Sequence, residues 1–147
     1  MSAVSASQVI KVQEETAVEV TKSSDNAVAA NVARVLSKVI GLAKTATQML
    51  MTAIYELGTN IISYAGKGII RLQIVEKNSC RGIRVIAEDG GPGIEDVQQA
   101  MVDGFSTQQQ FRSLGLGLGG VSRLMDEMSI CSQPGRGTRI SACKWMN

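Results

Sequence analysis

The chain has 147 residues, of which 44% are hydrophobic, which is enough for one domain with a proper core and too few for two comfortable ones. The formal net charge is +2 and the lysines and arginines are scattered, so the sequence has no basic cluster of the kind that a nucleic-acid partner requires. Three widely spaced cysteines without a CxxC pair indicate neither a disulfide framework nor a zinc site. Histidine is absent, which excludes imidazole bases, imidazole metal ligands and a phosphohistidine relay within this chain.

The sequence also lacks the usual signals for membranes and export. No stretch approaches the roughly 18 to 20 apolar residues of a membrane span. Residues 1–8 lack the basic region and apolar core of an export signal. We therefore expect a cytoplasmic protein without a membrane partner. Residues 1–8 are small and polar and are expected to be disordered, which leaves residues 9–147 as one domain.

The first half of the chain predicts an edge strand followed by two helices. Residues 9–20 alternate well enough for one or two short strands. Residues 24–40 predict a helix that begins at Ser24 or Asp25 and ends at Gly41. Its one-sided apolar stripe would comprise Val28, Val32, Val35, Leu36, Val39 and Ile40. The second helix, over residues 45–64, would bury Leu50, Ile54, Leu57 and Ile61.

The second half predicts two hairpins with helical pieces between them. Two β-rich runs on either side of Asn78 and Ser79 predict an antiparallel hairpin. Residues 94–101 predict a short helix, and residues 120–128 predict another. The tail, residues 129–145, predicts a second hairpin around Pro134 and its neighbouring glycines. The chain is therefore placed in the α+β class, with a mixed, mostly antiparallel sheet covered on one face by helices.

Glu56 and Asn60 lie four residues apart, so both side chains leave the same face of the second helix. A carboxylate and a carboxamide oxygen placed in this way can hold or approach a hard cation such as Mg²⁺. An exposed polar pair on an amphipathic helix has the same pattern, and the two interpretations stay open.

The stretch EDGGPG places Asp89 at the end of a strand and directly before a series of glycines. Glycine lets the backbone approach a ligand without interference from Cβ. An ionised aspartate only accepts hydrogen bonds, which suits an exocyclic amine such as that of adenine. A type I or type II turn, with aspartate and proline in their usual places, explains the same residues.

Two further glycine motifs follow. SLGLGLGGV, residues 113–121, opens a helix, and free backbone N–H groups at a helix N-terminus attract phosphate. It is neither a P-loop nor a dinucleotide fingerprint, because no Gly-Lys-Ser/Thr follows and no buried strand leads into it. GRGT, residues 135–138, fits a plain hairpin turn and also a turn whose threonine hydroxyl faces a bound ring.

The order of these four motifs resembles the ATP-binding boxes of the GHKL superfamily, which includes gyrase-type ATPases and the catalytic domains of histidine kinases. Within it the chain is similar to the small bacterial serine/threonine kinases related to anti-sigma factors, and most of all to the RsbT-type switch kinases of the stressosome. The stretches that carry this resemblance are AIYELGTNIISYAGKG, IAEDGGPGIEDVQQAMVDGFST, GVSRLMDE and GTRISACKW. The resemblance implies a Bergerat-type ATP-binding sandwich with ATP and Mg²⁺ as cofactors.

The resemblance also implies a role for each motif. Glu56 would position or deprotonate the attacking hydroxyl, and Asn60 would be the Mg²⁺ ligand. Asp89 would bind the adenine amino group. The other cofactor-binding residues would complete the adenine pocket, line the phosphates or close over them: Gly91, Gly93, Ser106, Thr107, Gly115, Leu116, Gly117, Leu118, Gly119 and Thr138.

The resemblance also implies a lid over the phosphates and raises a question about three residues. The lid implied by the resemblance spans residues 106–112. Lys67 and Arg112 are placed either to offer charge to the phosphates or to remain solvated on the surface. Ser113 stands where the superfamily often has a further glycine, which would stiffen the lid hinge.

In function, the resemblance implies transfer of the ATP γ-phosphate to a serine or threonine of a STAS-domain antagonist on a stressosome scaffold. The kinase would then act as a switch on a downstream effector such as a phosphatase. A sensor histidine kinase is excluded, because the chain has no histidine to receive phosphate. The alternative is an anti-sigma factor that sequesters a sigma subunit and uses ATP as a conformational ligand.

Overall fold

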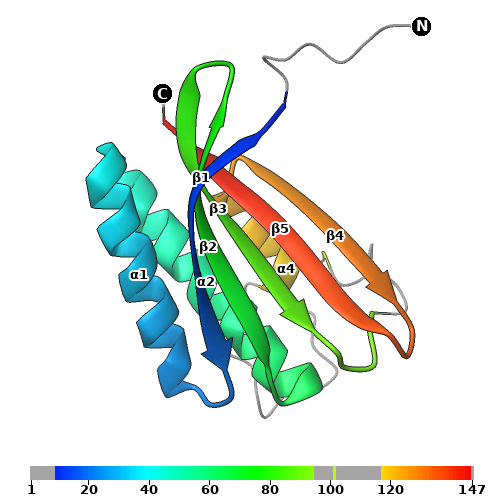
Figure 1. Cartoon of the computed structure of the whole chain (residues 1–147). Coiled ribbons are helices and arrows are strands. Elements are labelled where there is room, and N and C mark those ends of the chain that lie inside the picture. The colour runs from blue at the N-terminus through cyan, green and yellow to red at the C-terminus, as the bar shows by residue number, and fades with distance from the viewer. Residues whose placement is uncertain (1–8, 95–100, 102–116, 147) are drawn as a thin grey trace, which may run out of the picture.

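The computed structural model of the chain (Figure 1) describes residues 9–94, residue 101 and residues 117–146. Its elements, in chain order, are β1 (Lys11–Val20), α1 (Ser24–Ile40), α2 (Lys44–Ala65), β2 (Gly68–Lys77), β3 (Cys80–Asp89), α4 (Gly117–Leu124), β4 (Glu127–Gln133) and β5 (Gly137–Trp145). The expected disorder of residues 1–8 and the predicted lid lie outside the described residues. So does the predicted helix over residues 94–101, apart from its two ends.

The strands form one sheet in the order β1-β2-β3-β5-β4. Each of its four strand pairings is antiparallel, so the described sheet is purely antiparallel where a mixed sheet was predicted. β1 is a single edge strand, as the first of the two possibilities for residues 9–20 predicted. The three described helices cover one face of this sheet (Figure 1), which confirms the predicted α+β class.

The predicted hairpin between β2 and β3 is confirmed. Lys77 pairs with Cys80, which leaves Asn78 and Ser79 as a two-residue turn. Both turn residues have positive φ, 54° and 62°, as the tightest hairpin turns require, because this backbone twist matches the twist of the flanking strands. A short polar turn therefore fixes the register of the two central strands over their whole length.

The buried face of α1 differs from the predicted valine stripe. The residues packed against the sheet are mainly small, Ala29, Ala30 and Ala33, each at most 1% exposed, whereas Val28 and Val39 are 53% and 63% exposed. The prediction is confirmed for Leu36 and Ile40, which are buried. It is wrong for Val28, Val35 and Val39, because α1 carries two apolar rows and the alanine row allows the closer approach of helix to sheet. The three exposed valines stay on the outer face, whereas Val32 is partly buried against the core.

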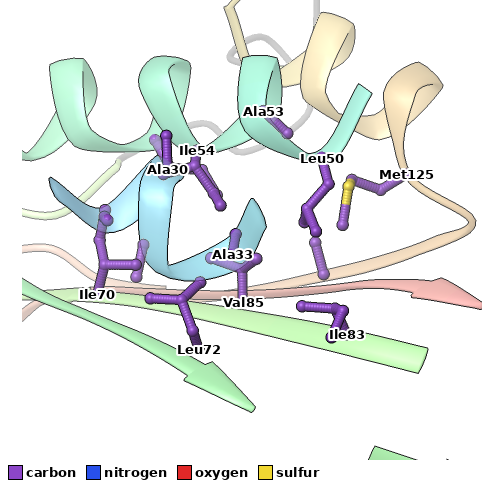
Figure 2. Close-up of a cluster of buried hydrophobic side chains, with 14 of the residues drawn as sticks. Ala30, Ala33, Leu50, Ala53, Ile54, Ile70, Leu72, Ile83, Val85 and Met125 are labelled. Atoms are coloured by element: carbon purple, nitrogen blue, oxygen red, sulfur yellow. The ribbon is translucent and has the colours of Figure 1, made fainter. Parts of the chain in front are cut away.

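The core lies between the sheet and α2. Figure 2 shows side chains of β2 and β3, among them Ile70 and Val85, pointing toward Leu50 and Ile54 of α2. The predicted buried line of α2, Leu50, Ile54, Leu57 and Ile61, is confirmed, because each of these side chains is at most 2% exposed. Each such burial contributes about 1.5 to 3 kcal/mol to stability.

The helix predicted over residues 120–128 begins and ends earlier, at Gly117 and Leu124. It ends there because Asp126 is drawn into the sheet: its backbone N–H donates to the Cys143 carbonyl at 2.9 Å, and its carboxylate accepts from the Trp145 N–H at 2.7 Å. Residues 127 and 128 therefore belong to β4. Among the described helices, none has the length and apolarity needed to cross a bilayer.

Candidate active site

Two of the motifs, the glycine loop after Asp89 and the GRGT turn between β4 and β5, lie at one end of the sheet. The end of β3, the β4–β5 turn and the C-terminal end of α2 lie together at the lower end of the molecule in Figure 1. A Cβ on Gly91 would lie 2.7 Å from the Cβ of Ala65, so the loop after β3 touches the last turn of α2. The fold therefore joins the Asp89 motif to the helix that carries Glu56 and Asn60.

Asp89 belongs to a row of paired residues that crosses all five strands and begins at Val20 of β1, which pairs with Gly68. Gly68 pairs with Asp89, Asp89 with Thr138, and Thr138 with Ser132. Paired residues in an antiparallel sheet point to the same face, so the three polar side chains share the face that the helices cover. The next row toward the middle of the sheet is apolar, Ile70, Ala87, Ile140 and Ile130. The polar row therefore marks the boundary between core and site.

The Asp89 carboxylate is fixed by backbone donors. The Gly91 N–H donates to Oδ1 at 2.9 Å, and the Thr138 N–H also donates to this carboxylate. Burial raises the pKa of Asp89 above its ordinary value, and these two hydrogen bonds oppose the rise. Asp89 therefore caps the loop that follows it through its side chain, and it keeps acceptor capacity, because a carboxylate can accept about four hydrogen bonds.

The glycine loop packs directly on the β4–β5 hairpin. The Gly135 N–H donates to the Pro92 carbonyl at 2.6 Å. Gly93 and Gly137 have φ values of 81° and 97°, and a Cβ would collide with the Gln133 carbonyl at the first and with the Asp89 carbonyl at the second. These glycines are required for contact between backbones. The prediction that Gly91 and Gly93 admit the adenine ring stays a prediction.

Ser132 is a site residue that the sequence reasoning missed. Its Oγ accepts from the Ile94 N–H at 2.7 Å, donates to the Gly137 carbonyl at 3.2 Å and lies 2.9 Å from Thr138 Oγ1. A signal was available, because the predicted hairpin around Pro134 places Ser132 opposite Thr138 once residues 134–136 are taken as its turn. Ser132 links the glycine loop, the hairpin turn and Thr138.

Glu56 and Asn60 occupy the part of α2 nearer its C-terminus. Glu56 is only 3% exposed and Asn60 is half-buried, so the alternative of an exposed polar pair is wrong for the glutamate. Charged side chains are rarely buried without a functional or structural reason. The structure thus places a buried carboxylate one turn from a carboxamide on α2, and the roles of these two residues stay predictions.

The glycine motif before α4 is described only from Gly117 onward. Gly117 begins α4 with a φ of 60°, Leu118 and Gly119 are buried, and α4 packs against α2. Lys67 is exposed between α2 and β2. The remaining predicted residues lie outside the described part of the chain: Ser106, Thr107, Arg112, Ser113, Gly115 and Leu116.

Comparison with known proteins defines the class. The profile of the histidine kinase-like ATPase domain family matches residues 19–144, which span the described elements from α1 to β5 apart from Trp145, the last residue of β5. The chain belongs to this family. Its fold is therefore that of an ATPase domain of the histidine kinase type, as predicted.

The relatives narrow this class. The chain is 42% identical over 133 residues to the serine/threonine-protein kinase RsbT of Bacillus subtilis, a match that covers 90% of this chain and 98% of that protein. It is 35% identical over 100 residues to the anti-sigma F factor of Caldanaerobacter subterraneus, covering 66% of this chain and 68% of that protein. The predicted enzyme class, an ATP-dependent serine/threonine protein kinase, is confirmed by the first match.

A solved structure agrees on the fold alone. The SiaB–SiaC complex from Pseudomonas aeruginosa contains a chain that superposes with a TM-score of 0.54 at 13% sequence identity. The match covers 92% of this chain and 91% of that chain. The architecture is therefore shared well beyond recognisable sequence similarity.

Proposed function

We propose that this kinase transfers the γ-phosphate of ATP to a serine or threonine of a STAS-domain antagonist on a stressosome scaffold, and then switches a downstream effector such as a phosphatase. The unit that acts is one ATP-binding domain, residues 9–147, working in the cytoplasm without nucleic acid or membrane partners. The observation that carries the proposal is the burial of Glu56 one helical turn from Asn60, on the helix that the Asp89 loop touches.

The nucleobase side of the site, called the base half below, consists of Asp89, Thr138, Ser132 and the glycine loop after β3. Its residues fit the adenine ring of ATP. Asp89 is held by two backbone N–H groups and keeps acceptor capacity for the 6-amino group of adenine. Thr138 lies beside it in the next strand. Among the described residues, none has an atom within 4 Å of where a Cβ on Gly90, the first residue after β3, would be. These features support a flat ring placed against the end of β3.

The phosphate side of the site, called the phosphate half below, consists of Glu56 and Asn60 on α2 and the start of α4. Its residues fit a magnesium nucleotide. Among the described residues no group of three or more His, Cys, Asp or Glu could hold a metal, so Asn60 is proposed as a single protein ligand. A single ligand suits Mg²⁺, which keeps several waters and binds phosphate oxygens. When bound, magnesium ATP supplies the phosphoryl group and neutralises its charge.

Glu56 is proposed to act on the attacking hydroxyl. Its carboxylate orients the serine or threonine of the substrate protein and accepts its proton, while Asn60 fixes the cation on the same face of α2. The backbone N–H groups at the start of α4 would bind the phosphates. The chain contributes positioning and charge complementarity, which are the main requirements of phosphoryl transfer.

The direct test is a transfer reaction. The purified chain, magnesium ATP and a STAS-domain antagonist from the same genome are mixed, and phosphoserine and phosphothreonine are measured by mass spectrometry. We expect about one phosphate per antagonist. Glu56→Gln should retain ATP but lose transfer, with Glu19→Gln, an exposed glutamate of β1, as the matched control. A wild-type chain that transfers no phosphate to any STAS-domain partner would overturn the proposal.

The anti-sigma function remains the second candidate, because anti-sigma F factors match about two thirds of this chain. The lower identity and shorter match favour the kinase switch. A sigma subunit that binds tightly in the presence of ATP, together with the absence of phosphate transfer, would decide for the second candidate.

A further inference from the structure

Ser132 connects three elements of the site through one hydroxyl group. Its Oγ lies 2.7 Å from the Ile94 N, 3.2 Å from the Gly137 carbonyl and 2.9 Å from Thr138 Oγ1. A serine hydroxyl has one proton and two lone pairs, so it can satisfy three such neighbours only in certain combinations. The number of protons therefore restricts the direction of each hydrogen bond.

The roles of two neighbours are fixed. The Ile94 N–H can only donate to Ser132, and the Gly137 carbonyl can only accept from it. Ser132 has one proton, and the Gly137 carbonyl needs it. The contact between Ser132 and Thr138 is then a hydrogen bond only if the Thr138 hydroxyl donates to Ser132 Oγ. Thr138 then presents lone pairs, and no proton, to the remaining space around its oxygen.

Thr138 is the direct strand partner of Asp89, whose ionised carboxylate also only accepts. Two neighbouring acceptors match the two hydrogens of an exocyclic amine, and both repel a carbonyl oxygen at the same position. We propose that Ser132 is a positioning residue that fixes Thr138 as an acceptor, so that the site selects 6-amino purine nucleotides over 6-oxo purine nucleotides. This inference rests on the proposed adenine pocket.

The same hydroxyl anchors the glycine loop on the hairpin. Its bond to the Ile94 N–H and the bond from Gly135 to the Pro92 carbonyl fasten the loop at two points. A change in affinity alone could therefore reflect a shifted loop. A change in the preference for ATP over GTP reports the direction of the Thr138 hydroxyl proton. A loss of loop anchoring alone would weaken both nucleotides and leave this preference unchanged.

The experiment compares ATP with GTP and inosine triphosphate. Dissociation constants are measured by isothermal titration calorimetry for the wild type, Ser132→Ala, Ser132→Thr and Thr138→Val. Ser129→Ala, an exposed serine of the same strand, serves as the control. Thermal unfolding without nucleotide shows that each variant is folded.

The wild type is expected to prefer ATP, and Ser132→Ala should reduce this preference by about tenfold, because one hydrogen bond of changed direction is worth about 1 to 1.5 kcal/mol. Ser132→Thr, which keeps the hydroxyl, should retain the preference. In a Thr138→Val background, Ser132→Ala should leave the preference unchanged, because no hydroxyl remains to orient.

Equal weakening of ATP and GTP by Ser132→Ala would overturn the inference and leave Ser132 as a loop anchor only. An unchanged preference in that variant, or a lost preference in Ser132→Thr, would also overturn it. In each of these cases the wild type still binds ATP, so the proposed function stands. A wild type that binds neither purine overturns the proposed pocket, and this inference with it.

Discussion

The two halves of the site are built by different means. In the base half, Asp89, Thr138 and Ser132 form one row of a sheet, and backbone hydrogen bonds join the glycine loop to the hairpin. In the phosphate half, Glu56 and Asn60 stand on α2 beside α4. Strand register fixes the first half and helix periodicity the second, so they should respond differently to substitution.

This difference has a physical consequence for each half. A sheet row places its side chains within about 5 Å of one another, and a single added Cβ can separate the strands. A helix face tolerates changes of side chain, because its backbone bonds stay within the helix. We therefore expect stability effects in the base half and chemical effects in the phosphate half.

The largest effect is expected at Glu56. Glu56→Gln should lower phosphate transfer at least about 100-fold, because general-base assistance typically contributes 10² to 10⁴ in rate. The amide has nearly the same size, so the folded structure and the affinity for ATP should be kept. Single-turnover transfer and ATP titration measure the two quantities separately. Full transfer activity in this variant would remove Glu56 from the mechanism.

The next effect is expected at Gly137, with Gly135 as its matched control. Both have positive φ, 97° and 78°, but a Cβ at Gly137 would collide with the Asp89 carbonyl, whereas a Cβ at Gly135 would have no atom of the described residues within 4 Å. Gly135→Ala should cost about 1 kcal/mol for the left-handed backbone, and Gly137→Ala about 3 kcal/mol or more with the steric conflict added. Denaturant unfolding measures both. Equal losses in the free energy of unfolding would show that the close approach of Gly137 to the Asp89 carbonyl does not affect stability.

Asp89→Asn should weaken ATP binding by about 10- to 100-fold, because it removes one charge-assisted hydrogen bond to the adenine amine. The neighbouring Glu88 is a sharp control, since its side chain lies on the other face of the sheet and pairs with Arg71 at 2.9 Å. Calorimetric titration of the two variants compares the faces directly. Unchanged affinity in Asp89→Asn would contradict the adenine assignment.

Asp89 also predicts a dependence of ATP affinity on pH. Only its ionised form accepts the amine, and burial raises the pKa of Asp89 above the ordinary 3.8. Affinity should therefore be constant near neutral pH and fall as the pH drops through this raised pKa. Asp89→Asn should lose this part of the dependence, and any part that remains belongs to the nucleotide. An identical profile in both proteins would contradict the prediction.

The free energy of unfolding of the unliganded protein should depend on pH in the opposite direction to ATP affinity, so that the Asp89 contribution to stability rises as the pH falls. A raised folded pKa means that ionising Asp89 costs more in the folded chain than in the unfolded chain. This cost is present in full above the raised pKa. It is relieved as the pH falls from that pKa to the ordinary 3.8. Denaturant midpoints of the wild type and Asp89→Asn over this pH range measure the difference.

The smallest effect is expected at Glu88. Its carboxylate also lies 3.8 Å from Arg139, and all three side chains are partly exposed. Glu88→Gln should change ATP affinity by no more than about twofold, because such surface substitutions usually stay within about 0.5 kcal/mol. A larger loss would show that the outer face of the sheet holds the base half in register.

Several features of the fold were predictable from the sequence, because they depend on neighbours along the chain. The buried line from Leu50 to Ile61 follows from helical periodicity, and the turn at Asn78 and Ser79 follows from local turn chemistry. The end of α1 at Gly41 is also local, since a glycine in the left-handed conformation closes the helix. These elements are the ones that the structure confirms.

Other features were beyond the sequence because they depend on which surfaces meet. Only the packing of α1 decides that the alanine row is buried and the row of Val28 and Val39 exposed, since both rows have helical spacing. Likewise, the end of α4 at Leu124 depends on hydrogen bonds from Asp126 to β5. Periodicity gives the possible faces, and close packing selects among them.

For the site, the sequence by itself determined the candidate residues and their order: Glu56 and Asn60 on a helix, Asp89 before glycines, and Thr138 after a glycine turn. Only the tertiary structure decided that Glu56 is buried and that Ser132 joins the row of Asp89 and Thr138. Motif spacing is a property of the chain. Burial and the direction of a shared proton arise only when separate strands are held in register.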